Sequence, residues 1–134
     1  MRRPAWAWAL LLALLLVPGA PAAARSTVVT FHRTGGFAGF DDSVRVFSDR
    51  RVVVRSRGAA ARRARLSVKG MRRLRRDLRA AHLERRLPAP GPSGCADCFE
   101  YTIAYGGHRV SVSEDRVPKR MRPAIARLSR LAGR

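Results

Sequence analysis

The chain contains few of the side chains from which catalytic and metal sites are built. It has nine acidic residues, three histidines and two cysteines among 134 residues. The histidines do not stand in the His-Glu-x-x-His spacing of a zinc protease, and no nucleophile-elbow, dinucleotide-binding or phosphate-loop motif is present. The likeliest acidic pair, Glu114 and Asp115, are sequence neighbours that we expect to cap the last helix. We therefore predict a protein that is not an enzyme and that uses no metal or cofactor.

Long hydrophobic runs are also scarce. The longest covers residues 5–17, which is shorter than the about 20 residues that a membrane-spanning helix needs. Two arginines precede this run and small residues ending at Ala24 follow it, which is typical of a secretory signal peptide. We predict cleavage after Ala24, secretion or location in the cell envelope, and one soluble domain over residues 25–134 without a transmembrane segment.

The two cysteines, Cys95 and Cys98, stand in the sequence Cys-Ala-Asp-Cys. No second Cys/His pair follows at the distance of a zinc finger, and a redox pair of this spacing would be expected to open a helix rather than precede a strand. In an exported chain the pair predicts a disulfide bond. So small a loop contributes only about 2 kcal/mol to stability in the chain-entropy model.

The chain has few acidic residues relative to basic ones. Without Arg2 and Arg3 of the predicted signal peptide, 26 basic residues stand against nine acidic ones, a formal net charge of +17. Such a charge favours attraction to polyanions or to an acidic partner. Coding bias is the alternative explanation, because arginine and alanine are abundant and lysine occurs only at Lys69 and Lys119.

The first half of the domain reads as three strands. Residues 26–31 are rich in β-branched side chains and predict a strand that stops at a glycine-rich segment. Residues 43–47 and 51–55 flank a short turn and predict a hairpin. Residues 58–65 are rich in alanine and arginine, show no usable periodicity, and are expected to be a linker.

An amphipathic helix is expected to begin after Ser67, a plausible N-cap, and to end near Leu83. Apolar residues recur at helical spacing on one stripe, at Val68, Met71, Leu74, Leu78 and Ala81. The opposite face carries five arginines, Arg72, Arg73, Arg75, Arg76 and Arg79. Asp77 lies four residues after Arg73 and is expected to pair with it.

The second half predicts a hairpin followed by a helix. Residues 99–105 and 108–113 alternate apolar and polar side chains around a Gly-Gly turn, and the aromatic row of the first strand should face the core. A second amphipathic helix should start properly near Arg122. The predicted fold is α+β: an antiparallel sheet of four to five strands with two amphipathic helices on one face, in the order β-β-β-α-β-β-α.

The glycine-rich segment after the first strand is the best candidate for binding a partner. Its candidate contact residues are Gly35, Gly36, Phe37, Gly39 and Phe40. Glycine permits backbone conformations that other residues avoid, and an exposed phenylalanine is available for burial by a partner. The alternative is that one of the two phenylalanines folds back into the core while the glycines merely make a turn.

The chain resembles the emfourin family, small bacterial inhibitors of thermolysin-like zinc metalloproteases. Four places carry the resemblance: Phe31 with Arg33-Thr34-Gly35-Gly36-Phe37-Ala38-Gly39, then Ala80-Ala81-His82-Leu83, then Phe99-Glu100-Tyr101-Thr102, and finally Val112 to Ile125 with its Glu114-Asp115 and Arg122-Pro123. They span nearly the whole predicted mature chain. The export signal, the cysteine pair and the high arginine content depart from what a cytoplasmic member would show.

The resemblance implies a non-enzymatic protein, expected to be a monomer, that occupies the cleft of a metalloprotease. Phe37 or Phe40 would enter a hydrophobic pocket of that cleft, and the positive net charge would steer the protein toward an acidic enzyme. The rival function is a basic module that binds the cell envelope or another polyanion through the arginine-rich face of residues 62–86. No stacking aromatics lie among those arginines, so nucleic-acid binding is not expected as the main role.

Overall fold

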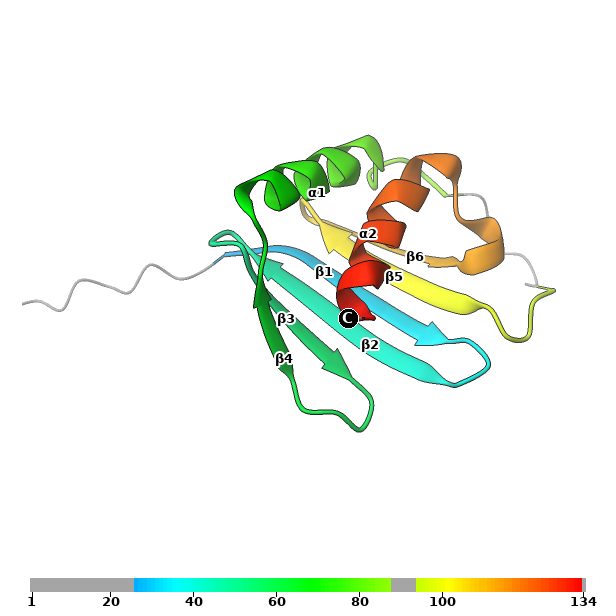
Figure 1. Cartoon of the computed structure of the whole chain (residues 1–134). Helices are drawn as coiled ribbons and strands as arrows, with labels where there is room; N and C mark the ends of the chain where they lie inside the picture. Colours follow the sequence, from blue (N-terminus) through cyan, green and yellow to red (C-terminus); the bar gives the residue numbers. More distant parts are fainter. Residues whose placement is uncertain (1–25, 88–93, 134) are drawn as a thin grey trace, which may run out of the picture.

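The computed structural model describes residues 26–87 and 94–133 and has an α+β fold, in which two helices cover one face of a six-stranded antiparallel sheet (Figure 1). The predicted signal peptide and its cleavage site lie outside these residues. The strands are β1 (Thr27–Gly35), β2 (Phe40–Phe47), β3 (Arg51–Ser56), β4 (Arg62–Arg65), β5 (Phe99–Tyr105) and β6 (His108–Ser113). The helices are α1 (Val68–Ala80) and α2 (Arg122–Ala132), and two short 3-10 helices, η1 (Glu114–Arg116) and η2 (Lys119–Met121), precede α2. The predicted fold class is confirmed, with one strand more than expected.

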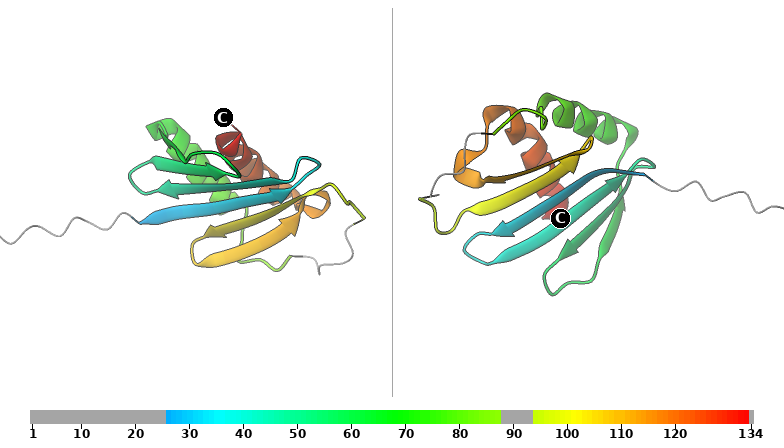
Figure 2. Two further views of the ribbon diagram at one scale, coloured as in Figure 1. Left: turned by 90° about the horizontal axis from the view of Figure 1, so that it is seen from below. Right: turned by 180° about the vertical axis from the view of Figure 1, so that it is seen from behind.

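The strands lie in the order β4-β3-β2-β1-β5-β6, so the first strand of the sequence is at the centre of the sheet. Every neighbouring pair is antiparallel, and β1 pairs with β2 on one side and with β5 on the other. Seen along its edge, the sheet has α1 and α2 on the same side (Figure 2, left). Neither helix of the described residues lies on the opposite face of the sheet (Figure 2).

The core lies between the sheet and the helices. Alternate residues of the strands face it, because successive side chains of a strand point to opposite faces. Phe31 and Ile103 stand opposite each other on β1 and β5, and neither is exposed at all. Leu74 of α1 and Leu128 of α2 are equally buried above them. The apolar side chains of the strands and of the two helices therefore form one continuous core.

Helix α1 begins where its sequence predicts. The hydroxyl oxygen of Ser67 accepts a hydrogen bond from the backbone N–H of Gly70 at 2.9 Å, which is N-capping. The predicted stripe is buried at Met71, Leu74, Leu78 and Ala81, whereas Val68 remains 58% exposed. The helix ends at Ala80, three residues before the expected end, because the chain turns into the left-handed region at His82, whose φ is 47°.

The expected pair of Asp77 with Arg73 within α1 is wrong. Asp77 instead connects α1 to α2. It is 8% exposed, and one of its carboxylate oxygens accepts a 2.7 Å hydrogen bond from Nε of Arg127 on α2. A buried carboxylate needs such a partner. The partner lies 50 residues away in the sequence, so the local i, i+4 rule could not find it.

The prediction of a linker at residues 58–65 is also wrong, because these residues include the edge strand β4. Its four residues pair with β3, from Arg51 opposite Arg65 to Val54 opposite Arg62. An edge strand needs neither a buried face nor a hydrophobic pattern, which explains why periodicity missed it. Arg62 also donates a 2.6 Å hydrogen bond to the carbonyl oxygen of Leu131, so the edge is fastened to the end of α2.

The pair Glu114 and Asp115 does not cap the last helix. Both residues belong to η1, and α2 starts only at Arg122, as the sequence predicted. The carboxylate of Glu114 instead accepts a 3.1 Å hydrogen bond from the backbone N–H of Phe99 at the start of β5. Glu114 therefore fastens the start of β5, whereas Asp115 lies next to Arg116 within η1. None of the helices in the described part of the chain is both long and apolar enough to cross a membrane.

Candidate partner-binding tip

The connection between β1 and β2, residues 36–39, is hereafter called the tip. It is shorter than the glycine-rich segment suggested, because β1 continues to Gly35 and β2 already begins at Phe40. Phe37 is 95% exposed and Phe40 is 43% exposed, so neither side chain fills the core. The alternative in which one of them plugs the sheet is therefore wrong.

Glycine is required at the end of β1 and at the start of the tip for both conformation and space. Gly35 and Gly36 have φ angles of 90° and 71°, in the left-handed region that side chains avoid. A Cβ atom on Gly35 would lie 2.7 Å from the carbonyl oxygen of Cys98, and one on Gly36 would lie 2.7 Å from the ring of Phe99. The backbone N–H of Gly36 donates a 3.3 Å hydrogen bond to that same carbonyl oxygen of Cys98. The tip is thus held against the segment that leads into β5.

Phe40 belongs to an aromatic cluster beside the tip. Its ring meets the ring of Phe99 edge-on, with 5.6 Å between centroids, and the guanidinium of Arg33 lies 5.1 Å from each of the two centroids. Arg33 in turn forms a part-buried ion pair with Asp42. These contacts give Phe40 a structural role that Phe37 does not have.

The glycine-rich segment after Phe31 predicts a loop at Arg33, so the pair of Arg33 with Asp42 is not predicted from the sequence. On β1 the residues that face the helices are Val29, Phe31 and Arg33, and Arg33 stands opposite Asp42 on β2. A charged residue at an inward position breaks the hydrophobic alternation. The one available signal is position, because Arg33 follows Phe31 by two residues and so shares its face if the strand continues.

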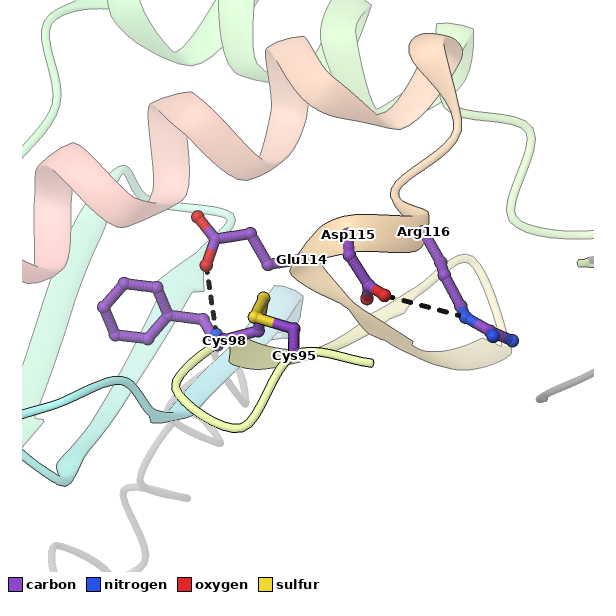
Figure 3. The surroundings of a disulfide bond; sticks show 6 residues. Cys95, Cys98, Glu114, Asp115 and Arg116 are labelled. Carbon is purple, nitrogen blue, oxygen red and sulfur yellow. Dashed lines mark hydrogen bonds and ion pairs between the residues drawn. A yellow bond between two sulfur atoms is a disulfide. The ribbon is translucent and has the colours of Figure 1, made fainter. Parts of the chain in front are cut away.

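A disulfide bond braces the chain next to the tip. Cys95 and Cys98 are joined, as predicted, and the bonded pair lies directly before β5. Figure 3 shows Glu114 reaching from η1 to the backbone next to Cys98, with Asp115 and Arg116 paired at 3.9 Å behind it. The tip, the disulfide turn and η1 therefore form one end of the molecule.

The acidic residues of this basic protein gather at that end. Of its nine carboxylates, six lie on the tip side of the sheet: Asp41, Asp42, Asp97, Glu100, Glu114 and Asp115. All except Asp42 are exposed. Burial raises the pKa of the Tyr101 phenol above 10.0, and the charge of Glu114 acts in the same direction. The tip therefore presents an apolar ring among carboxylates, not a basic surface.

An open pocket of about 400 Å³ lies on one side of the tip. Gly39 and Phe40 line it from the tip, Arg57 from the β3 end, and Ala132 and Gly133 from the end of α2. Its size is at the lower end of what small-molecule sites show. It leaves room for part of a partner chain beside Phe37.

The arginines predicted as a polyanion face lie on the outer side of α1. Arg72, Arg73, Arg75, Arg76 and Arg79 are all exposed. Only Arg76 has a described carboxylate within 4 Å, Asp77 at 3.8 Å. Within residues 26–87 and 94–133 no three His, Cys, Asp or Glu side chains are grouped so that they could hold a metal ion.

Comparison with known proteins gives no family for the chain: no protein-family model matches it, and no curated protein matches its sequence.

Proposed function

We propose that the protein is a secreted, non-enzymatic inhibitor of a thermolysin-like zinc metalloprotease and that Phe37 is the residue it inserts into the enzyme. The observation that carries the proposal is the 95% exposure of Phe37 on a short, braced tip. The resemblance to emfourins over the tip, the first helix, β5 and the segment through η1 supports the same function.

The tip suits insertion because little order has to be created on binding. Two glycines fix the turn, a hydrogen bond joins Gly36 to Cys98, and the disulfide closes the neighbouring turn. Preorganisation of this kind lowers the entropic cost of association. Burying a phenylalanine side chain gains about 2–3 kcal/mol, which corresponds to roughly 30–150-fold in affinity.

The charge around the tip suits a cleft that contains a cation. Asp41 and Asp97 are exposed at this end of the molecule, and Glu114 accepts a hydrogen bond from the backbone N–H of Phe99, which follows the disulfide turn. A zinc ion is often the largest local charge in its site, so carboxylates near the mouth of the cleft meet a favourable potential. The arginine-rich remainder of the molecule steers it toward an enzyme with an acidic surface.

A panel of thermolysin-like metalloproteases tests the proposal through stoichiometric inhibition of peptide hydrolysis. The variant Phe37→Ala should weaken inhibition of a susceptible enzyme by at least about tenfold. Val68→Ala is the matched control, because Val68 is also an exposed apolar residue, at 58%, but lies at the start of α1. No inhibition of any enzyme at micromolar excess, or equal inhibition by the Phe37→Ala variant, would contradict the proposal.

The rival function, a basic cell-envelope or polyanion-binding module on α1, receives less support. The five exposed arginines of α1 lie on the outer side of the helix, spread over roughly 160° at about 100° per residue, and a charged outer side is what solvation of an amphipathic helix already requires. Such a module would bind anionic polymers without affecting proteolysis. The inhibition panel therefore separates the two functions.

A further inference from the structure

The face of the sheet that carries no helix has an uneven distribution of charge. Five exposed arginines project from this face on the neighbouring strands β2, β3 and β4: Arg45, Arg51, Arg55, Arg63 and Arg65. These five residues are called the arginine face. The other half of the same open face, on β1, β5 and β6, carries one exposed arginine, Arg109, and hydroxyl groups such as the hydrogen-bonded pair Thr102 and Ser111. His32 of β1 forms an ion pair with Asp41 of β2.

Strand register fixes how the arginines are spaced. Arg51 stands directly opposite Arg65, while Val53 stands between Arg45 on one side and Arg63 on the other. Neighbouring strands lie about 4.8 Å apart, and alternate residues of one strand about 7 Å apart. The five side chains therefore start from one array on three neighbouring strands and project from the same face of the sheet.

Most of this charge is not neutralised within the protein. Arg51 pairs with Asp49 at 3.1 Å. No ion pair joins Arg45, Arg55, Arg63 or Arg65 to a carboxylate among the residues that the structure describes. Like charges placed directly opposite each other destabilise a sheet, so the arrangement costs stability.

Protection of the sheet edge explains only part of the pattern. Charged residues on an edge strand discourage pairing with another chain, which is sufficient reason for Arg63 and Arg65 on β4. Arg45 and Arg55 lie on interior strands, where no edge needs protection. A ligand that bridges three strands accounts for all five positions.

We propose that the arginine face binds a linear polymer of phosphate groups, laid across β2, β3 and β4. Guanidinium groups bind phosphate through two parallel hydrogen bonds, and an array of arginines that runs across three strands fits an extended chain of phosphates. Val53 stands between Arg51 and Arg55 on this face, and the aromatic residue that shares the face with Arg45, Phe47 at the end of β2, is half-buried, which leaves little ring surface for stacking of a nucleobase. The proposal concerns the helix-free face and does not depend on protease inhibition.

The test compares two triple variants that lose the same charge. One replaces the arginine face, Arg45→Ser, Arg55→Ser and Arg63→Ser, and the other replaces α1, Arg72→Ser, Arg73→Ser and Arg76→Ser. Binding of long-chain inorganic polyphosphate is measured by titration calorimetry over a range of salt concentrations. We expect the sheet variant to lose at least about tenfold in affinity and to show a shallower salt dependence, while the α1 variant changes by less than about threefold.

Equal losses in the two variants would overturn the proposal, because they would indicate attraction by overall charge. The same holds if polyglutamate or phosphatidylglycerol vesicles bind as tightly as polyphosphate. Circular dichroism establishes that each variant is folded. A third variant, with lysine at positions 45, 55 and 63, keeps both charge and fold and should still lose affinity, because lysine cannot form the bidentate contact.

Discussion

Two phenylalanines only six residues apart have opposite surroundings. Phe31 lies in the middle of β1, is completely buried, and stacks on Tyr101 with 6.0 Å between ring centroids. Phe37 lies at the tip that follows the same strand and is 95% exposed. The core can therefore explain the first residue but not the second. The apolar surface of Phe37 is therefore not buried on folding and remains available to a partner.

The largest expected effect comes from truncating the two rings. Phe31→Ala should lower the free energy of unfolding by about 3–5 kcal/mol, because it leaves a cavity beneath both helices. Phe37→Ala should change it by less than about 0.5 kcal/mol, because the ring contacts mainly water. Urea denaturation measures both values. Similar losses in the two variants would mean that the comparison between core and tip is wrong.

A pair of glycine substitutions tests whether the tip is held rigidly. Gly35 and Gly107 have φ angles of 90° and 82°, but only Gly35 has another atom, the carbonyl oxygen of Cys98, where a Cβ would go. Gly107→Ala should cost about 1–2 kcal/mol for its conformation alone. Gly35→Ala should cost about 1–3 kcal/mol more because of the contact. Equal losses in the free energy of unfolding for the two variants would show that the backbone near the tip shifts to accommodate the added Cβ and is not held rigidly.

The disulfide should have a smaller effect on stability. Replacing both Cys95 and Cys98 by serine should lower the free energy of unfolding by about 2 kcal/mol, since the closed loop is very short. Reduction of the disulfide in the unmodified protein should lower the urea midpoint as much as the two serine substitutions do. A loss as large as that of Phe31→Ala would mean that the disulfide turn supports the core and not only the tip.

The smallest effect concerns pH. Burial raises the pKa of Tyr101, so above pH 10.0 the phenol ionises more readily in the unfolded chain than in the folded one. This contribution to stability is complete below pH 10.0 and is lost as the pH rises through the folded-state pKa. The urea midpoint should therefore fall less steeply between pH 9 and 11 in Tyr101→Phe. Parallel slopes would indicate that the ring is not buried.

Much of the fold could be predicted because it follows local periodicity. Alternation located β5 and β6, and the stripe of Met71, Leu74 and Leu78 located α1. What the sequence did not predict depends on distant partners. Strand β4 has no pattern of its own, and Asp77 finds Arg127 only after the helices pack.

The candidate site was predicted in composition but not in detail. The glycines and Phe37 pointed to an exposed turn, and Phe37 is exposed. The different role of Phe40 depends on Phe99 and Arg33, which reach it from other strand positions. The arginine face was missed because its five members become neighbours only through the register of three strands.

The most direct test of the central claim is to map the surface that contacts a metalloprotease. Backbone amide resonances of the isotope-labelled protein are followed by NMR while an unlabelled, catalytically inactive thermolysin-like enzyme is added. We expect the signals of Gly36, Phe37 and Gly39 to change first, with those of the disulfide turn, while signals of α1 and the arginine face stay unchanged. Changes confined to α1 or to the arginine face, with the tip unaffected, would contradict the central claim.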